Sequence, residues 1–399
     1  MLLALCYGAV ERRPLRAAGT FSITNPAGPY ISGGPIAIQT SGIHGRLALS
    51  LIGPGDLEGN LYNTPALAHA QNATIVAATP FAYALAELHL VPPPHAGEKI
   101  IAVAGYGSGI ALHSEKNFAL IGIIASAEPV GDVAVGADGA LYAPLTDTTT
   151  MMVVTRAPWS VGQIGNVPSG NEVAIDRSDG AIFISNRDVA GKGALTRILH
   201  GITDRVVTGI TAEGLALDEA GHHIFVGNVN DESVLEVDTR TMGTVRRLQS
   251  VPRTFGIALD ERARNLFVVS NQNERMRHGG GYVARIDLAP ARGRIAARSK
   301  NLPFPLGIAY DAKTRHVFTT DEDLGSVYVF NADTLLEAHR ALSACNLPWR
   351  PHIDERLRRL YVPCAKANAV AVFNLDTLRE LPGSPFATGT YPLGVATSN

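Results

Sequence analysis

The chain has 399 residues, of which 46% are apolar and 18% charged, with 40 glycines and 24 prolines. This length allows a large core and more than one domain, and the composition suits a turn-rich all-β protein. The net charge of −2 gives no reason to expect nucleic acid or an acidic membrane as a partner, and no stretch approaches the ~20 apolar residues of a transmembrane helix.

The segment 1–17 opens with an apolar run, Met1 to Ala9, that has no positively charged start and is shorter than a normal signal core. It fits a truncated or lipoprotein-like leader ending at Cys6, or a frayed or buried N-terminus. We therefore expect residues 1–17 to be a leader or disordered. A leader would place the protein outside the cytoplasm, as a secreted, periplasmic or cell-surface protein.

Residues 18–92 alternate apolar and polar side chains at the period of a β-strand. The segments that do so are 20–24, 35–40, 46–52, 73–78 and 83–90, separated by Gly, Pro and Asn turns. The pattern is similar to a small immunoglobulin-like sandwich, although the paired Cys and core Trp of antibody domains are missing. Residues 93–96, within a run of three prolines and a histidine, are expected to form a stiff linker.

From residue 97 to 399 one pattern returns: a short strand closing on Asp, a tight turn, and a second strand with an aromatic residue seven positions after the Asp. The Asp anchors fall at 176, 218, 260, 311 and 354, and two degenerate copies without Asp add anchors at 136 and 398, with spacings of 40 to 51 residues. Repeats of this length with short β segments are typical of a β-propeller with four strands per blade. The sequence thus predicts an all-β chain with a seven-bladed propeller at 97–399.

The final repeat stops after its first strand, which would leave an unpaired edge. Residues 99–105, 109–113 and 119–125 have the pattern of strands two to four without a first strand before them. Pairing of the two ends would complete the last blade and close the ring. An alternative uses residues 45–90 as blade strands and gives eight blades.

Two of the three cysteines, Cys345 and Cys364, fall where both could lie towards one face of the ring. They could form a disulfide or remain two buried thiols, which is the commoner state. No Cys or His spacing resembles a zinc site.

The segments Phe255 to Asn271 and Arg359 to Asn374 resemble YVTN- and NHL-type propeller repeats. That superfamily includes gluconolactonase-like and virginiamycin B lyase-like enzymes as well as binding proteins. The resemblance covers roughly residues 97–399 and implies a fold more than a function.

Function is sought where the repeats disagree, at the loop that enters each first strand. The repeats mostly have Gly four residues before the anchor and Ala two residues before it, and departures from such a packing rule indicate function. The candidate ligand-binding residues at the channel mouth are Asp132, Asn171, Glu172, Glu213, Trp349, Arg350 and His352. His352 is either a channel-filling side chain or a catalytic one.

If a metal binds, Asn171, Glu172 and Glu213 are its expected ligands, and their oxygen donors favour calcium or magnesium. His352 would be the acid or base and Arg350 the group that stabilises a developing oxyanion. The recurrent anchor Asp residues are expected to cap turn amides instead. We therefore predict a propeller that binds a small molecule or a protein partner at its channel mouth, with a metal-dependent lactonase-like hydrolase or a lyase as the alternative.

Overall fold

The computed structural model describes residues 22–25, 28–42, 46–80, 82–272, 280–289 and 293–398. The expected leader, residues 1–17, lies outside them. Within the described residues the chain consists of short β-strands and one 3₁₀ turn, Ala365–Ala367, which confirms the all-β prediction. No helix in this part of the chain has the length and apolar character needed to span a bilayer.

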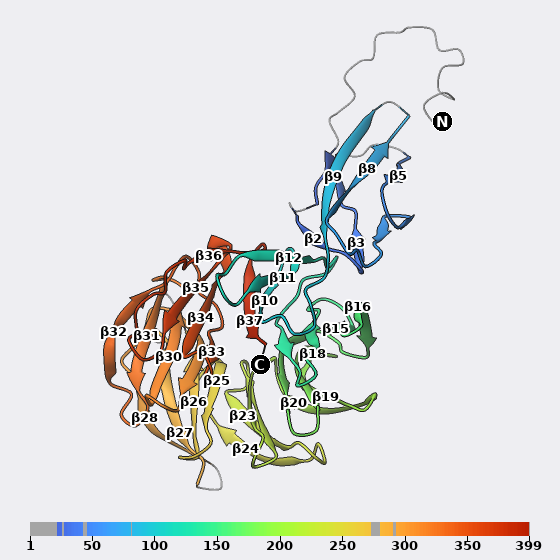
Figure 1. Cartoon of the computed structure of the whole chain (residues 1–399). Helices are drawn as coiled ribbons and strands as arrows, with labels where there is room; N and C mark the ends of the chain where they lie inside the picture. The colour runs from blue at the N-terminus through green and yellow to red at the C-terminus, as the bar shows by residue number, and fades with distance from the viewer. Residues whose placement is uncertain are drawn as a thin grey trace, which may run out of the picture.

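Among the described residues, six antiparallel sheets of four strands follow one another along the chain. The first three are β13–β16 (Ala134–Val135, Leu141–Pro144, Thr150–Arg156, Trp159–Gly165), β17–β20 (Gly170–Ile175, Ile182–Val189, Lys192–Leu199, Ile202–Gly209) and β21–β24 (Ala212–Asp218, His223–Asn228, Ser233–Asp238, Thr244–Gln249). The next three are β25–β28 (Thr254–Asp260, Asn265–Ser270, Tyr282–Asp287, Arg294–Arg298), β29–β32 (Pro305–Asp311, His316–Asp321, Ser326–Asn331, Glu337–Ser343) and β33–β36 (His352–Asp354, Arg359–Cys364, Ala369–Asn374, Phe386–Ala387). Figure 1 shows these sheets arranged around a common centre.

A larger sheet has the strand order β37-β10-β11-β12-β2-β9-β8-β5. Its strands are Pro392–Thr397, Ile100–Gly105, Gly109–Ser114, Leu120–Ile124, Tyr30–Ile31, Tyr83–Val91, Gln71–Ala78 and Ala48–Ile52. The C-terminal strand β37 pairs antiparallel with β10, where Val395 lies opposite Val103, as the sequence predicts for these two ends. The first strand of each successive sheet contacts the next, and β37 contacts both β13 and β33. A propeller-like arrangement is confirmed, while the count of seven blades and the closure of the ring stay predictions.

The aromatic residue that recurs on five of the second strands lies in the core between neighbouring sheets. The side chains of Phe183, Phe225, Phe267, Phe318 and Tyr361 are all fully buried. Phe225 packs against Ile257 and Val268 of the next sheet, and Phe318 packs in the same way against Leu360 and Val362. Each such ring removes a large apolar surface from water, which explains why an aromatic residue recurs at this position.

The anchor Asp residues cap the turn that follows them, as expected. A side-chain oxygen of Asp218 accepts a hydrogen bond from the backbone N–H of Gly221 at 2.7 Å, and Asp354 accepts one from Leu357 at 2.8 Å. These bonds satisfy turn amides that no strand partner reaches.

The same Asp residues also join neighbouring sheets through an arginine that the sequence analysis did not single out. Arg264 reaches Asp218 at 2.5 Å, Arg315 reaches Asp260 at 3.2 Å and Arg358 reaches Asp311 at 2.6 Å. Each arginine lies four residues after the anchor of its own sheet and pairs with the anchor of the preceding sheet. We call these contacts the arginine clasps.

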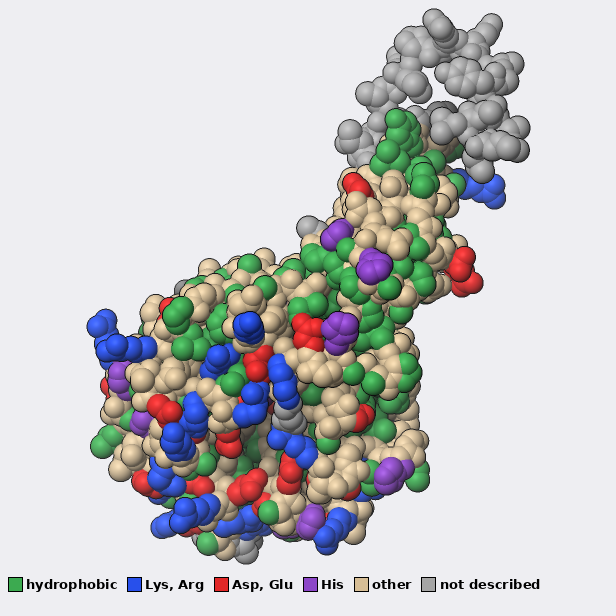
Figure 2. Space-filling model, in the orientation of Figure 1, with side chains coloured by type: hydrophobic (Ala, Val, Ile, Leu, Met, Phe, Trp, Pro, Cys, Tyr) green, Lys and Arg blue, Asp and Glu red, His purple; other side chains and the backbone are tan. Residues whose placement is uncertain are grey.

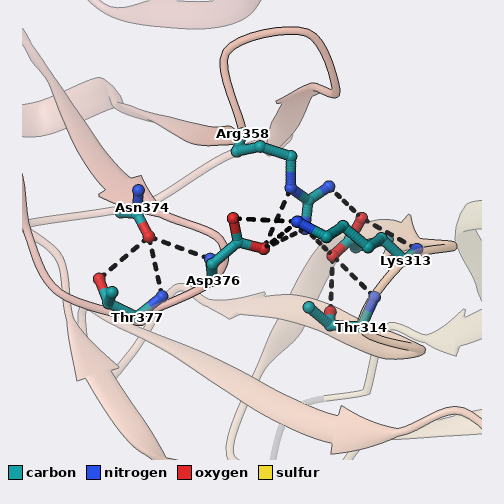
Figure 3. Close-up of polar contacts among 7 residues, drawn as sticks. Lys313, Thr314, Arg358, Asn374, Asp376 and Thr377 are labelled. Carbon is teal, nitrogen blue, oxygen red and sulfur yellow. Dashed lines mark hydrogen bonds and ion pairs between the residues drawn. The ribbon is translucent and has the colours of Figure 1, made fainter.

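Figure 3 shows the clasp of Arg358, which also pairs with Asp376 of its own sheet at 3.0 Å. Two guanidinium nitrogens donate to the two oxygens of Asp311, at 2.7 and 2.6 Å, and Thr314 donates to the same carboxylate. Burial alone would raise the pKa of Asp311, but the hydrogen bonds from Arg358 and Thr314 outweigh it and hold the pKa at about 2. The clasp is therefore a desolvated, bidentate ion pair.

We expect Arg358→Met to lower the free energy of unfolding by about 3 kcal/mol at neutral pH, because a buried carboxylate loses its partner. The folded-state pKa of Asp311 lies below its ordinary value, so its stabilising contribution is present above about pH 4 and is lost as the pH falls towards 2. Urea unfolding of the variant and the parent should therefore differ most near neutral pH and least near pH 2. Arg294→Met, which removes an exposed arginine whose nearest acidic oxygen is 3.7 Å away, is the control. A loss independent of pH would contradict this account.

The N-terminal strands extend the larger sheet beyond β12. Strand β2 runs parallel to both β12 and β9, so the sheet continues from the propeller into the part of the chain that projects from it in Figure 1. Two smaller sheets complete this part, β1 (Ser22–Ile23) with β4 (Thr40–Ser41), and β3 (Pro35–Ala37) with β7 (Leu61–Asn63) and β6 (Asp56–Glu58). Its core contains Tyr30, Ile36, Tyr62, Ile75 and Leu90. The immunoglobulin-like character of residues 18–92 is not confirmed.

The segment 93–96 is held against the propeller. Arg156 donates hydrogen bonds to the carbonyl oxygens of His95 and Glu98, at 2.8 and 2.7 Å.

A second contact joins the N-terminal part to the propeller. Trp159 packs against Gly33, whose φ of +84° and contact with the indole leave no room for a side chain. The division of the chain into 18–92, a linker at 93–96 and 97–399 stays a prediction.

Cys345 and Cys364 form a disulfide with their Cα atoms 5.8 Å apart. It joins the segment before β33 to the end of β34, and Cys364 is fully buried. Of the two alternatives left open by the sequence, the bonded pair is the one present.

Candidate functional site

The predicted site residues lie on the first strands of the sheets, or in the loops that enter them, around the centre of the propeller. A cavity of about 290 Å³ occupies this centre. Its polar lining includes Asp132, Glu172, Arg350 and His352, and its walls are formed by apolar side chains such as Val173, Leu215, Ile257 and Ile308. Four of the predicted residues thus line one cavity.

Arg350 gathers four groups around its guanidinium. Its Nε lies 2.6 Å from a carboxylate oxygen of Glu172, and its Nη2 donates to Asn171 Oδ1 at 2.9 Å. The same nitrogen lies 3.5 Å from Glu213 Oε2, and Nη1 donates to the carbonyl oxygen of Gly131 at 3.1 Å. The side chain of Arg350 is only 11% exposed. This cluster, called the Arg350 cluster below, is a desolvated charge network.

Glu213 is the most deeply buried acid of the Arg350 cluster, with 2% of its side chain exposed. It accepts hydrogen bonds from Asn171 Nδ2 at 2.6 Å and from Arg187 Nε at 2.5 Å. Arg187 was missed by the sequence analysis. Its position near the end of β18, a second strand, could have indicated it. The loop that follows each second strand reaches the same end of the channel as the loop that enters each first strand.

Two of the predicted acids also hydrogen-bond the backbone of the next sheet. Asp132 accepts from the N–H of Val173 at 3.2 Å, and Glu172 accepts from the N–H of Leu215 at 2.8 Å. At the matching position of the next sheet, Gly214 packs so closely on the carbonyl of Phe255 that an added Cβ would lie 2.5 Å from its oxygen. The acid at this position therefore has a structural role, because its carboxylate accepts a hydrogen bond from a backbone N–H of the next sheet. Where the position is Gly, the two backbones lie too close together for a side chain.

Burial is the main influence on the charges of this cluster. It raises the pKa of Asp132 to about 6 and that of Glu172 to about 7, although the nearby Arg350 opposes both shifts. Burial also disfavours the guanidinium charge of Arg350, but Glu172, Asp132 and Glu213 outweigh it and raise the pKa of Arg350. The guanidinium therefore stays charged, while Glu172 takes up a proton near neutral pH.

His352 lies on β33, towards the other end of the same cavity. Its Nε2 is 3.3 Å from Thr397 Oγ1, and its ring lies 6.3 Å from that of Tyr361. Burial lowers the pKa of His352 to about 4, against a smaller opposing effect of Asp354. The imidazole is therefore neutral at pH 7 and a weak base, which favours the channel-filling interpretation.

We expect this histidine to make the protein sensitive to mild acid. Its folded-state pKa lies below the ordinary value of 6.5, so its contribution is intact above about pH 6.5 and is lost as the pH falls towards 4, on the order of 3 kcal/mol in total. In His352→Gln the free energy of unfolding should fall less between pH 7 and pH 4.5 than in the parent. His69→Gln, at an exposed histidine, is the control. Parallel pH profiles for parent and His352→Gln would contradict the shift.

The three expected metal ligands do not fit a divalent cation in this arrangement. Their oxygens accept hydrogen bonds from Arg350, Arg187 and the Asn171 amide, so guanidinium groups already supply the positive charge. No group of three His, Cys, Asp or Glu side chains that could hold a metal ion is found in the described part of the chain.

On the other side of the Arg350 cluster lies a second cavity of about 410 Å³. It is lined by Tyr106, Thr146, Asn171, Arg187, Trp349, Arg350, Tyr391 and Leu393. Tyr106 and Tyr391 meet edge to face with ring centres 6.2 Å apart, and Trp349 is braced by Phe255 at 6.3 Å. We call this cavity the aromatic mouth. Trp349 is among the residues predicted from the sequence, whereas Tyr106, Thr146 and Tyr391 are not, because they stand outside the aligned repeat positions.

Two buried polar atoms of the aromatic mouth have no hydrogen-bond partner within the described residues. They are Thr146 Oγ1 and Trp349 Nε1. Buried polar groups are nearly always paired in proteins, so each such atom calls for an explanation. Together they offer one donor and one group that can either donate or accept, beside three aromatic rings.

Comparison with known proteins supports the fold. No protein-family model and no curated protein matches the sequence. Solved structures that resemble it include a putative 6-phosphogluconolactonase from Bacteroides fragilis, with a TM-score of 0.60 and 11% identity over 77% of this chain and 100% of that one. Virginiamycin B lyase from Staphylococcus aureus has a TM-score of 0.53 and 14% identity over 66% and 87% of the two chains. The Swd1 β-propeller domain from Myceliophteria thermophila gives 0.56 and 10% over 70% and 95%.

These likenesses define the class of the protein. It has a β-propeller fold, with the Arg350 cluster near its centre and a cavity on each side of that cluster. At identities of 10 to 14% the likeness concerns the fold alone.

Proposed function

We propose that this protein is a binding propeller that holds a small, uncharged, hydroxylated ring compound in the aromatic mouth. The observation that carries the proposal is the pair of buried, unpartnered polar atoms, Thr146 Oγ1 and Trp349 Nε1, beside the rings of Tyr106 and Tyr391. A ring compound with hydroxyl groups satisfies both demands, because its face covers an aromatic side chain and its hydroxyls pair with the polar atoms.

The charges below the aromatic mouth favour an uncharged ligand. The cations Arg187 and Arg350 are matched by Glu172 and Glu213, with ion-pair distances of 2.5 to 3.5 Å. A charged ligand in the aromatic mouth would lose its hydration shell. It would gain no counter-ion in return, because these arginines and glutamates already pair with one another.

The same arrangement favours binding over catalysis. Both oxygens of Glu172 are engaged, one by Arg350 and the other by the N–H of Leu215, and His352 is a weak base. Among the described residues, those that line the aromatic mouth include no carboxylate and no histidine, so none of them is a general base of ordinary strength. A protein partner at this mouth is the broader alternative, and the small cavity favours a small molecule.

For the propeller itself we propose seven blades. Six four-stranded sheets, together with β37, β10, β11 and β12, make seven groups of four strands. The contacts of β37 with both β13 and β33 support a ring in which the last blade contains both ends of the propeller. We further propose that the protein works outside the cytoplasm, because the disulfide of Cys345 and Cys364 would persist there.

The binding proposal is tested by fluorescence, since the chain has two tryptophans, Trp159 and Trp349. In Trp159→Phe protein, Trp349 is the only emitter. Titration with methyl glycosides should change its emission saturably, and Thr146→Val should weaken binding about tenfold, because one hydrogen bond is lost. Gluconate and glucosamine, as charged analogues, serve as comparison ligands. A response to the charged compounds and none to the neutral ones would refute the proposal.

A second candidate is a lactonase-like or lyase-like enzyme. The specific observation in its favour is the pKa of Glu172 near 7, which suits an acid–base residue. Hydrolysis of glucono-δ-lactone should then be lost in Glu172→Gln and kept in Glu128→Gln, at an exposed glutamate. Absence of hydrolysis with and without added calcium or magnesium would exclude the lactonase.

A further inference from the structure

The opposite end of the channel has a different character from the aromatic mouth. There, where the first strands end at their anchor Asp residues, lies a cavity of about 620 Å³. Its charged and phenolic lining consists of Arg177, Glu219, Tyr310, Asp354, Glu355 and Arg356. Figure 2 shows acidic and basic side chains gathered around a hollow close to the C-terminus marked in Figure 1, and Ser398 lines this cavity. We call it the acidic mouth.

Two acids of this mouth, Glu219 and Glu355, occupy one repeated position, the residue directly after the anchor Asp. Arg177 occupies it in another sheet, and so does Glu261, which does not line the cavity itself. Burial and the charges of Asp218, Glu219 and Glu355 raise the pKa of Glu261. Glu219 and Glu355 of the mouth therefore both repel the carboxylate of Glu261, and a cationic ligand beside them would relieve that repulsion.

A second, independent observation points into the same cavity. Asp354 has only 4% of its side chain exposed, and its Oδ2 has no hydrogen-bond donor within the described residues. The nearest cation is Arg356, whose guanidinium lies 3.6 Å away and is also held by Glu115. A buried carboxylate oxygen without a donor is costly, and a ligand N–H would satisfy it.

The spacing of the acids decides the kind of cation. No three acidic or histidine side chains in the described part of the chain are close enough to share one metal ion. Separate carboxylates around a cavity of about 620 Å³ suit a flexible chain with several separated ammonium groups, each of which pairs with one acid. From this geometry we infer that the acidic mouth binds a linear polyamine.

Replacement of Arg177 tests the inference in the opposite direction, because it should strengthen polyamine binding, whereas a misfolded variant would bind more weakly. Arg177 is exposed, lines both the acidic mouth and the central cavity, and makes no hydrogen bond or ion pair within the described residues. Its charge opposes a cationic ligand, so its removal should strengthen binding.

The experiment is isothermal titration calorimetry of the full chain with spermidine at low salt. We expect saturable binding to the parent, about tenfold weaker binding to Glu219→Gln/Glu355→Gln, and tighter binding to Arg177→Ala. Glu128→Gln, at an exposed acid away from this mouth, should bind like the parent. Magnesium and calcium chloride at the same ionic strength should not compete beyond the effect of salt.

Absence of spermidine binding would overturn the inference, as would binding that is unchanged in both the Glu219→Gln/Glu355→Gln and Arg177→Ala proteins. Specific competition by magnesium or calcium would show a general cation site instead. Melting temperatures of all variants, measured without ligand, separate a loss of binding from a loss of fold.

Discussion

Replacement of Arg350 by methionine is expected to lower the free energy of unfolding by about 3–5 kcal/mol at about pH 9, and by less near neutral pH, where Glu172 can take up a proton. The variant leaves Glu172 without its guanidinium partner, while Glu213, which has only 2% of its side chain exposed, loses Arg350 and keeps Arg187. Removal of one member of a buried charge network costs more than its presence contributes, because the remaining charges stay desolvated. Equilibrium urea unfolding followed by circular dichroism measures the loss.

The matched control is the double variant Arg350→Met/Glu172→Gln. Glutamine keeps the shape of Glu172 without its charge and can still accept the hydrogen bond from the N–H of Leu215. The double variant should therefore recover a large part of the loss, which identifies the unpaired charge as its cause. If the double variant were less stable than Arg350→Met alone, the network would not depend on charge neutralisation.

Deletion of residues 393–399 is expected to cost roughly 5 kcal/mol or more, since β37 carries the buried side chains of Leu393, Val395 and Ala396. The deletion also leaves β10 with an unpaired edge, because Val103 and Ala102 lose the partners that Val395 and Ala396 provide. The melting temperature should fall sharply, and the shortened protein should aggregate more readily.

Removal of Asn399 alone is the control, because this residue lies beyond the end of β37. A synthetic peptide of residues 390–399, added in trans, should restore part of the lost stability by pairing with β10. An unchanged melting temperature after the larger deletion would show that the ring does not depend on this strand.

The fold could be predicted because its repeat has one physical cause. A buried aromatic ring such as Phe225 and a turn-capping anchor such as Asp218 recur in five of the six four-stranded sheets of the described residues, so both leave a periodic signal. The pairing of β37 with β10 followed from the incomplete last repeat. The parallel pairing of β2 with β12 and β9 could not be predicted, because it involves one residue pair with β12 and two with β9 and has no recurring pattern.

The site was predictable only in part. Departures from Gly and Ala identified Glu172, Arg350 and His352, and the structure places all three around one cavity. The same rule could not show that Glu172 also serves the backbone of the next sheet, because that role depends on a hydrogen bond across a sheet boundary. Tyr106 and Tyr391 were missed because they lie in connections between strands, where the repeat has no fixed residue to depart from.

The arginine clasps bear on how such a chain can change in length during evolution. The sheets β25–β28 and β29–β32 each carry an arginine that fits the preceding anchor and an anchor that receives the following arginine. If the gene segment for one of them were duplicated in tandem, the added sheet would have an anchor Asp before it for its own arginine and an arginine after it for its own anchor Asp. No new contact surface between sheets would be needed. Tandem duplication could thus produce propellers with other numbers of blades. The number of sheets that can be added is limited by the pairing of β37 with β10, which must still form.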